Sequence, residues 1–353
     1  MRIYIYSGGE KLVGRSGVGQ AIRHQRECLR RSGVPTTDRW TRDAAAVHVN
    51  TVLPDSVFAA LGAKLRGRKV VWYGHSTMED FRSSFKGSNA LAPLFRRWIT
   101  FCYGLGDVVL TPTEYSRRLI QSYGLKKPVY SISNGVDTDF FHPDPAARAA
   151  LRARYGLEPE AKVVVSVGHT IARKGLPEFL ELARRVPEAR FLWFGWTDPR
   201  LIPQDISQAI QNAPANVVFA GYVGREELRE AYQGADVFAF LSHEETEGIV
   251  VLEALACGVP TVLRDIPVYE GWLEDGKNVY KASNDSEFQR IVEGMLDKTL
   301  PDLTAAGRAV AEARSLEQVG KRLKEIYLRE QVLPVPFLER KGAKRALARH
   351  GAW

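Results

Sequence analysis

Short apolar runs alternate with helix-length segments along nearly all of the 353-residue chain, and this alternation constrains the fold more than any other feature. A first series of strand-like runs extends from "RIYIYS" to "PVYSIS", and a second begins at "AKVVVSVG" and ends at "PTVLRD". Strands that alternate with helices form parallel sheets with helices on both faces, and such sheets bind ligands at the carboxyl ends of their strands. The sequence therefore predicts an α/β chain with two doubly wound parallel sheets.

The two series indicate two domains, which we expect over residues 1–150 and 151–330. Prolines and a short helical pattern in "FFHPDPAARAALRARYGLEPEA" separate the two series. A chain of 353 residues also exceeds what one hydrophobic core usually supports. We therefore place the domain boundary in this proline-containing segment.

The composition excludes several classes of protein. With 45% hydrophobic and 25% charged residues, the chain is neither disordered nor disulfide-rich. No apolar run approaches the roughly 18 residues of a membrane-spanning helix, and the first residues form a strand pattern rather than a signal peptide. The cysteines, Cys28, Cys102 and Cys257, lie far apart without metal-ligand spacing, so we expect reduced thiols. These features favour a cytoplasmic protein.

The charge is unevenly distributed along the chain. The net charge of +8 divides into +10 for residues 1–150, −6 for residues 151–330 and +4 for residues 331–353. A basic first half and a basic tail are typical of contact with nucleic acid or with an anionic membrane surface. An uneven charge that serves only solubility explains the same values, so charge alone leaves both interpretations open.

The segment "SHEETEGIVVLEALACGVPTV" combines two carboxylates with a glycine and an apolar run. Glu245 and Glu253 lie eight positions apart, and each can accept two hydrogen bonds from a pair of sugar hydroxyls. Gly248 lets the backbone approach a ligand, and the amides of Ile249 and Val250 lie at the predicted start of a helix, where N–H groups bind phosphate. We interpret the segment as a site for a polyhydroxylated ligand. The structural alternative is a strand edge followed by a buried helix with solvated charges.

Three segments, "SNGVDTDFFHPD", "VGHTIARKG" and "EETEGIVVLEALACGVPTV", resemble in order and spacing the motifs of the retaining GT-B glycosyltransferases of family GT4. The resemblance covers nearly the whole chain. It implies the GT-B fold, in which two Rossmann-like domains face each other across a cleft and a tail, here residues 331–353, packs back on the first domain. It also implies transfer of a hexose from a nucleotide sugar with retention of anomeric configuration, by same-face attack and without a metal ion or other cofactor.

The resemblance assigns expected roles to individual residues. Glu253 would bind the ribose hydroxyls of the nucleotide sugar, and Glu245 would bind the transferred sugar and support positive charge at its anomeric carbon. Arg173 and Lys174 would neutralise the departing diphosphate, although a solvated basic pair before a helix is the structural alternative. His169 stands where many relatives carry an arginine, in a slightly shortened segment.

A glycine-rich segment precedes the first predicted helix. The stretch "GRSGVGQAIRHQ" is similar to the family's glycine-rich loop, in which Gly17 and Gly19 would let backbone amides face the diphosphate from the first domain. It is neither a Walker motif nor a complete GxGxxG fingerprint, which disfavours an ATPase and a dehydrogenase.

The stretch "WYGHSTMEDFRSSFKGSNALAPLFRRW" places His75 at the carboxyl end of a predicted strand. A histidine at the matching loop of the family lies beside acceptor and donor sugar, so we predict a catalytic role for His75, with Asp80 as a further acceptor-side candidate. The aromatic and basic side chains that follow favour contact with anionic headgroups. The alternatives are a structural histidine and an ordinary helix with one solvated face.

These segments make the chain similar to bacterial glycolipid synthases that add a hexose to glucosyl- or galactosyl-diacylglycerol. The similarity implies UDP-glucose or UDP-galactose as donor, a glycosyl-diacylglycerol acceptor, and peripheral association with the inner face of the cell membrane. A mannosyl- or glucosyltransferase with a soluble or polysaccharide-intermediate acceptor stays open among enzymes. A noncatalytic nucleotide-sugar-binding protein stays open outside them, whereas no nucleic-acid-binding module is visible.

Overall fold

The computed structural model describes residues 1–9, 14 and 17–333. Its first half contains a parallel sheet with the strand order β2-β1-β3-β4-β5-β6. The strands are β1 (Arg2–Tyr6), β2 (Thr36–Thr37), β3 (Ala44–Val49), β4 (Lys69–Tyr73), β5 (Val108–Thr111) and β6 (Val129–Ser131). The helices are α2 (Gly17–Arg31), α3 (Pro54–Leu65), α4 (Met78–Phe81), α5 (Ser88–Gly104) and α6 (Glu114–Ser122).

Helices cover both faces of this sheet, because alternate residues of its strands pack into two separate cores. On β4, Val71 and Tyr73 join the core that contains α2 residues. Val70 and Trp72 point to the opposite face and join the core under α3 and α5. All four side chains are buried, which explains the continuous apolar pattern in place of an alternating one.

The second half contains a parallel sheet with the strand order β12-β11-β10-β7-β8-β9. The strands are β7 (Lys162–Val167), β8 (Ala189–Phe194), β9 (Val217–Gly221), β10 (Val237–Phe240), β11 (Thr261–Arg264) and β12 (Tyr280–Ala282). The helices are α7 (Ala147–Arg154), η1 (Ala172–Lys174), α8 (Leu176–Arg185), η2 (Pro199–Leu201), α9 (Gln204–Gln211), α10 (Arg225–Gly234), α11 (Ile249–Cys257), η3 (Pro267–Tyr269), α12 (Asp285–Leu296), α13 (Thr304–Glu312) and α14 (Leu316–Arg329).

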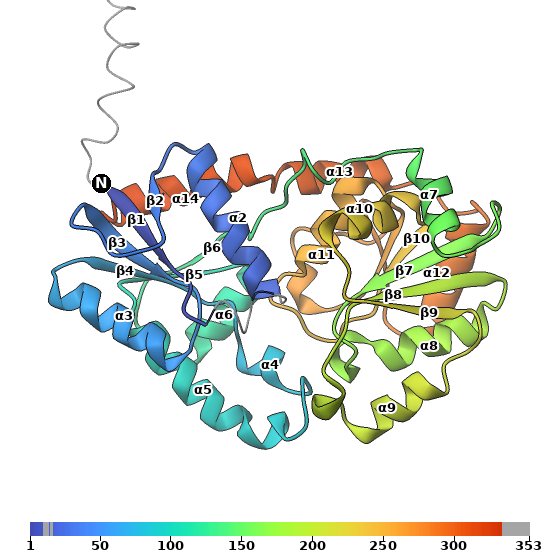
Figure 1. Ribbon diagram of the computed structural model, residues 1–353, viewed down its shortest axis with the longest axis horizontal. Helices are drawn as coiled ribbons and strands as arrows, with labels where there is room; N and C mark the ends of the chain where they lie inside the picture. The colour runs from blue at the N-terminus through green and yellow to red at the C-terminus, as the bar shows by residue number, and fades with distance from the viewer. Residues whose placement is uncertain (10–13, 15–16, 334–353) are drawn as a thin grey trace, which may run out of the picture.

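The two sheets form two lobes that lie side by side (Figure 1), which confirms the predicted fold of two doubly wound parallel sheets. The sequence-based boundary at residue 150 falls inside α7, which packs against α10 of the second lobe. The proposed division into residues 1–150 and 151–330 stays a prediction. None of the helices in residues 1–9, 14 and 17–333 has the length and apolarity that a membrane crossing requires.

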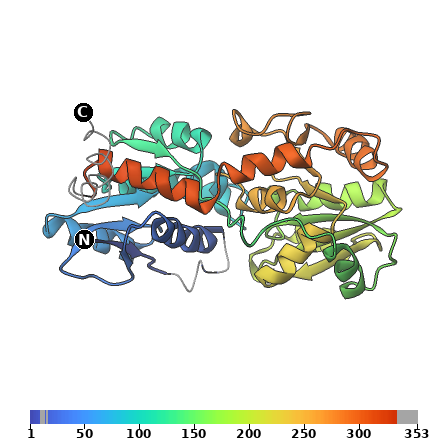
Figure 2. The same ribbon diagram turned by 90° about the horizontal axis from the view of Figure 1, so that it is seen from above.

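The last helix returns from the second lobe to the first. Figure 2 shows α14 lying along the first lobe, where it packs against α2. Gly320 permits this close approach, since a Cβ atom there would lie 2.2 Å from the carbonyl oxygen of Cys28. Val332 and Leu333 continue this packing in the same core. The rest of the predicted tail, residues 334–353, lies outside the described residues.

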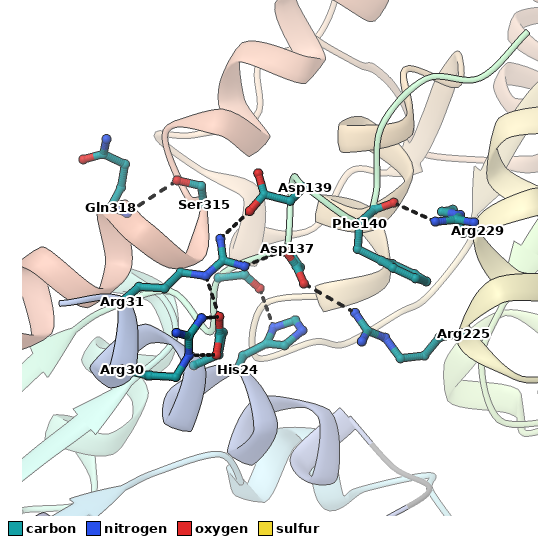
Figure 3. A network of polar contacts seen from close by, with 12 residues as sticks. His24, Arg30, Arg31, Asp137, Asp139, Phe140, Arg225, Arg229, Ser315 and Gln318 are labelled. Carbon is teal, nitrogen blue, oxygen red and sulfur yellow. Dashed lines mark hydrogen bonds and ion pairs between the residues drawn. The ribbon is translucent and has the colours of Figure 1, made fainter. Parts of the chain in front are cut away.

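The segment that joins the lobes is held from both sides (Figure 3). Arg31 of α2 donates hydrogen bonds to Asp137 at 3.0 Å and Asp139 at 2.8 Å. From the second lobe, Arg225 of α10 lies 4.0 Å from the Asp137 carboxylate and its guanidinium stacks over the Phe140 ring at 4.3 Å. Asp137 therefore forms ion pairs with both lobes.

Candidate functional site

A cavity of about 360 Å³ lies between the lobes and is lined by residues from both of them. Its lining contains nine of the ten residues that the sequence predicts for the site: Gly17, His75, Arg173, Lys174, Glu245, Gly248, Ile249, Val250 and Glu253. Gly19, the tenth, is buried within α2 and does not line the cavity. Residues almost 240 positions apart in the sequence thus meet around one space.

The loop between β10 and α11 places the two predicted carboxylates. Gly248 ends the loop in the left-handed region at a φ of 86°, a conformation that favours glycine, and α11 begins at the next residue. Ile249 and Val250 form the first turn of α11 and face the cavity with the partial positive charge of a helix N-terminus. Glu245 comes from the loop and Glu253 from the helix, so the two carboxylates reach the cavity from different directions.

Glu253 is buried and already satisfied by protein donors. Its two carboxylate oxygens accept hydrogen bonds from the Tyr232 hydroxyl and from Nε2 of Gln20, each at 3.2 Å. Burial raises the pKa of Glu253 to about 7. The Gln20 bond crosses from the first lobe to the second. A ligand that donates hydroxyl hydrogen bonds would favour the charged carboxylate and lower this pKa.

Glu245 forms an ion pair with Lys174, whose amine donates directly to the carboxylate. Burial by itself would raise the pKa of Glu245, but Lys174 and Arg173 hold it below its ordinary value. The carboxylate is therefore negative near neutral pH, next to two positive side chains. This arrangement can bind both the hydroxyls and the phosphates of one ligand.

Arg173 is held by groups from both lobes. Its Nη1 forms an ion pair with Asp80 Oδ1 at 2.7 Å and donates a hydrogen bond to the Glu244 carbonyl at 2.8 Å, and its Nε donates to Ser84 Oγ at 2.9 Å. The Arg173 side chain is only 9% exposed, so these contacts fix its guanidinium. Asp80, which the sequence analysis predicts on the acceptor side, thus lines the cavity directly beside Arg173, which is predicted to bind the diphosphate.

His75 follows β4 at the carboxyl edge of the first sheet and is 7% exposed. Its Nε2 lies 3.2 Å from Asn50 Oδ1, and its ring stacks on Tyr73 at 4.2 Å. Burial lowers the pKa of His75 to about 3, so the imidazole is neutral at physiological pH. A neutral imidazole can accept or donate a hydrogen bond but cannot act as a cationic acid.

Gly17, a predicted phosphate-binding residue, and His169, to which the sequence assigns no role, also line the cavity. Gly17 begins α2, and a Cβ atom there would meet nothing within 4 Å, so glycine leaves open space beside the cavity. Arg15 and Ser16 of the glycine-rich segment lie outside the described residues. His169 lines the cavity, and its Nδ1 lies 3.0 Å from the Trp196 carbonyl. Burial lowers the pKa of His169, which favours its neutral form.

The sequence analysis missed several polar residues in or next to the site, and the following three illustrate why. Gln20 reaches Glu253, Asn50 contacts His75, and Glu247 accepts hydrogen bonds at 2.9 and 2.8 Å from the backbone and side-chain amides of Asn134. A signal exists for Asn50 alone, because it directly follows a strand at the ligand-binding edge of the sheet. Gln20 contacts the opposite lobe, and Glu247 contacts Asn134 in the segment that joins the lobes. Such long-range contacts leave no local pattern in the sequence.

The aromatic and basic side chains that follow His75, in residues 81–98, are partly packed and partly exposed. Phe81 stacks on Phe95 at 4.0 Å. On α5 an apolar stripe at helical spacing faces solvent, with Leu91, Leu94 and Phe101 exposed by 50%, 65% and 52%. Helix α3, over the same face of the sheet, exposes a second stripe formed by Phe58 (72%), Leu61 (41%) and Leu65 (89%).

Metal-ligating side chains do not gather in the described part of the chain. No group of three or more His, Cys, Asp or Glu residues there is placed to hold a metal ion. The expectation of metal-independent chemistry stays a prediction. Cys28, Cys102 and Cys257 are free and buried.

Comparisons with known proteins agree with this geometry. Residues 15–140 match the family described as "Glycosyltransferase Family 4" and residues 147–311 match "Glycosyl transferases group 1". The chain is 38% identical over 93% of its length to the processive diacylglycerol alpha-glucosyltransferase of Acholeplasma laidlawii, 98% of which is covered. It is 27% identical over 97% of its length to the alpha-galactosylglucosyldiacylglycerol synthase of Streptococcus pneumoniae, 90% of which is covered.

Solved structures share the arrangement of the two lobes. The crystal structure of Anabaena HepE in complex with UDP-glucose superposes with a TM-score of 0.75 at 16% identity, covering 92% of this chain and 99% of that one. At this identity the likeness shows the fold alone. The two facing Rossmann-like lobes are those of the GT-B architecture.

Proposed function

Because the chain belongs to the family 4 glycosyltransferases, we propose that it transfers glucose or galactose from a UDP-sugar to a glycosyl-diacylglycerol, with retention of anomeric configuration. The observation that carries the proposal is the cavity between the lobes, in which Glu253, the Lys174–Glu245 pair and His75 lie together. In this proposal Glu253 binds ribose hydroxyls, Lys174 binds the diphosphate, and Glu245 and His75 contact the reacting sugar.

The donor site uses the second lobe. Glu253 binds the ribose hydroxyls, for which it exchanges its bonds to Gln20 and Tyr232. Lys174, Arg173 and the N-terminus of α11 neutralise the diphosphate as the bond to the sugar breaks, which is the charge stabilisation that a leaving group needs. Glu245 binds hydroxyls of the transferred sugar and stabilises positive charge at its anomeric carbon. These groups supply the positive charge without a metal ion.

The first lobe provides the acceptor side. His75 and Asp80 line the cavity from the first lobe and lie between β4 and α5 in the chain. The names of the two relatives support a lipid acceptor, since one is called a diacylglycerol glucosyltransferase and the other a galactosylglucosyldiacylglycerol synthase. In our proposal, the acceptor hydroxyl attacks the same face of the sugar from which UDP departs, and a donor phosphate oxygen takes its proton.

The acceptor requires contact with a membrane, and we place this contact on α3 and α5. Their exposed apolar stripes lie over one face of the first sheet. Lys86, which precedes α5, and Arg96 and Arg97, in the middle of α5, are exposed. Apolar side chains that enter the interface and basic side chains near anionic headgroups both favour peripheral binding, at about 1 kcal/mol for each basic residue. The protein would act at the inner face of the cell membrane.

The test is a transfer assay with a panel of nucleotide sugars, with and without vesicles that contain monoglycosyl-diacylglycerol. We expect mass spectrometry to detect a lipid that has gained one hexose from a UDP-sugar, and the NMR coupling constant of its new anomeric proton to report an α linkage. Donor hydrolysis without a lipid product would overturn the glycolipid acceptor and favour a soluble or polysaccharide acceptor. The absence of turnover with every donor would favour a noncatalytic binding protein.

A further inference from the structure

A chain of buried polar side chains extends from His75 through the first lobe to the C-terminal helix. His75 lies beside Asn50, Asn50 pairs with Gln25, Gln25 contacts His48, and His48 contacts the hydroxyl of Tyr327 on α14. These five residues are between 0% and 7% exposed. Four elements of the fold, α2, β3, β4 with its following loop, and α14, thus share one hydrogen-bonded network.

The central pair of this network is held by two reciprocal hydrogen bonds. Asn50 Nδ2 donates to Gln25 Oε1 at 2.9 Å, and Gln25 Nε2 donates to Asn50 Oδ1 at 3.2 Å. The second hydrogen of Gln25 Nε2 is directed to His48 Nε2 at 2.9 Å. Buried amides are costly unless they are satisfied, and a satisfied network restricts the rotation of its members. The amide of Asn50 therefore has one orientation, with its oxygen toward His75.

This orientation determines which ring nitrogen of His75 carries the proton. Asn50 Oδ1 can only accept a hydrogen bond, so His75 Nε2, at 3.2 Å, must be the donor. A neutral imidazole has one protonated nitrogen, which leaves Nδ1 with a free lone pair. The ring plane is fixed as well, because Tyr73 stacks on it with an interplanar angle of 7° and donates its own hydroxyl to the Ile132 carbonyl at 2.5 Å.

We propose that Asn50, held by Gln25, is a positioning residue that keeps His75 in the Nε2–H tautomer, so that its Nδ1 accepts a hydrogen bond from a substrate hydroxyl. The inference rests on the proposed function, because it assumes a sugar substrate in the cavity that His75 lines. It assigns His75 the role of a hydrogen-bond acceptor that orients a hydroxyl, and it adds two residues behind His75 that do not touch the substrate.

The titratable groups around His75 are compatible with a neutral ring. Tyr73 stacks on the His75 ring, and His48 in turn stacks on Tyr73. Burial raises the pKa of Tyr73 and lowers the pKa of His48 to about 3, so both are uncharged near neutral pH. The charged side chains that line the same cavity are Asp80, Glu245, Glu247, Glu253, Arg23, Arg173, Lys174 and Arg225. They provide charges of both signs.

The first experiment observes the wild-type protein directly. In protein labelled with 15N-histidine, NMR distinguishes protonated from unprotonated ring nitrogens, and a His75→Gln variant assigns the signals of His75. We expect His75 to show a protonated Nε2 and an unprotonated Nδ1, without titration between about pH 5 and 8. A protonated Nδ1, or titration near the ordinary value of about 6.5, would overturn the proposal.

The second experiment changes Asn50. In Asn50→Asp, a carboxylate next to Nε2 stabilises the imidazolium, raises the pKa of His75 and removes the Nδ1 lone pair at low pH. The carboxylate can raise this pKa from about 3 to at most about 6, so we expect kcat at pH 5 relative to pH 8 to fall by up to about tenfold further than in the wild type, with donor KM unchanged. In Asn50→Ala, kcat falls about 10- to 100-fold at every pH, because no acceptor then holds the proton on Nε2 and the Nδ1 lone pair is no longer fixed toward the substrate.

Two controls separate the possible failures. Asn284→Asp makes the same chemical change at the N-cap of α12, where Asp is an equally good cap, and we expect it to keep the wild-type pH profile. If the wild type transfers hexose and folded Asn50 variants keep its kcat and pH profile, the proposal is wrong while the proposed function stands. If the wild type is inactive, the proposed function fails, and the NMR measurement still decides the tautomer.

Discussion

At the scale of single residues, the side chains that we propose to bind the nucleotide sugar are paired with other protein groups. Lys174 is paired with Glu245, Arg173 with Asp80, and Glu253 with hydrogen-bond donors from both lobes. Buried charges are costly unless they are paired, so these contacts keep the groups in place until a ligand replaces them. If these groups bind a nucleotide sugar as proposed, binding exchanges these protein partners for the ligand, and the affinity is the difference between the two sets of contacts.

The first prediction concerns the two ends of the donor site. We expect Glu253→Ala to raise the donor KM by about 10- to 100-fold, since a hydrogen bond to a charged group contributes about 1.5–3 kcal/mol. Lys174→Ala should mainly lower kcat, by about 100-fold, because the charge on the leaving diphosphate is greatest in the transition state. Steady-state kinetics with the donor measure both effects. Glu181→Ala, which removes an exposed carboxylate on α8, is the control and should leave both constants unchanged.

A second prediction at this scale follows from the pKa of Glu253. Burial raises this pKa from 4.5 in the unfolded chain to about 7, so the folded protein binds a proton more tightly than the unfolded chain. This contribution to stability is complete below about pH 4.5 and is lost as the pH rises through about 7. Ribose hydroxyls need the charged carboxylate, so UDP binding near pH 7 should release a proton.

Isothermal titration calorimetry of UDP binding in buffers with different ionisation enthalpies measures this release. We expect a slope that indicates proton release at pH 7 and a smaller release at pH 8.5, where the carboxylate is already charged. Burial also raises the pKa of Glu244 to about 7, so the comparison with Glu253→Gln isolates the contribution of Glu253. An unchanged slope in that variant would contradict the assignment of the proton to Glu253.

At the scale of helices and strands, the sequence predicts the repeating parts well and the contacts between them poorly. The strand series predicts both sheets because each buried strand is a continuous apolar run. The loop that carries Glu245 and the helix that carries Glu253 are likewise local patterns. The Arg173 contact with Asp80 joins α4 to η1 across the cleft, and its formation depends on how the lobes pack. No spacing in the sequence reports that packing.

The third prediction tests the exposed stripes of α3 and α5 as a membrane contact. We expect Leu94→Glu combined with Phe101→Glu to lower the affinity for vesicles of phosphatidylglycerol and monoglucosyl-diacylglycerol by at least about tenfold, because burial of each apolar side chain contributes about 1.5–3 kcal/mol. UDP affinity should not change, since neither residue lines the cavity. Vesicle flotation and calorimetry measure the two properties.

A matched change elsewhere shows whether position or only charge matters. Leu201 in η2 of the second lobe is 53% exposed, close to the 52% of Phe101, and Leu201→Glu introduces the same acidic group away from the two stripes. We expect this variant to bind vesicles like the wild type. Equal losses in both proteins would point to general repulsion by anionic lipid and would remove the assignment of the contact to α3 and α5.

At the scale of the whole molecule, the cavity exists because two lobes are held against each other. The linker connects them once, and α14 connects them a second time by returning to α2. The network around Asp137 adds ion pairs from Arg31 of the first lobe and Arg225 of the second (Figure 3). In the proposed reaction the donor and acceptor groups come from different lobes, so we expect loss of this contact to lower turnover more than donor affinity.

The last prediction removes that contact. We expect Asp137→Ala to lower kcat/KM for transfer by about 3- to 10-fold, because a half-buried ion-pair network contributes on the order of 1 kcal/mol, while UDP affinity stays within about twofold. Asp139→Ala is the matched control, since Asp139 pairs with the same Arg31 but is 79% exposed. Small-angle X-ray scattering should give a larger radius of gyration for Asp137→Ala than for Asp139→Ala. Salt screens ion pairs, so raising the salt concentration to about 0.5 M should lower the transfer rate of the wild type more than that of Asp137→Ala. Equal salt dependence in the two proteins would mean that the linker does not act through this network.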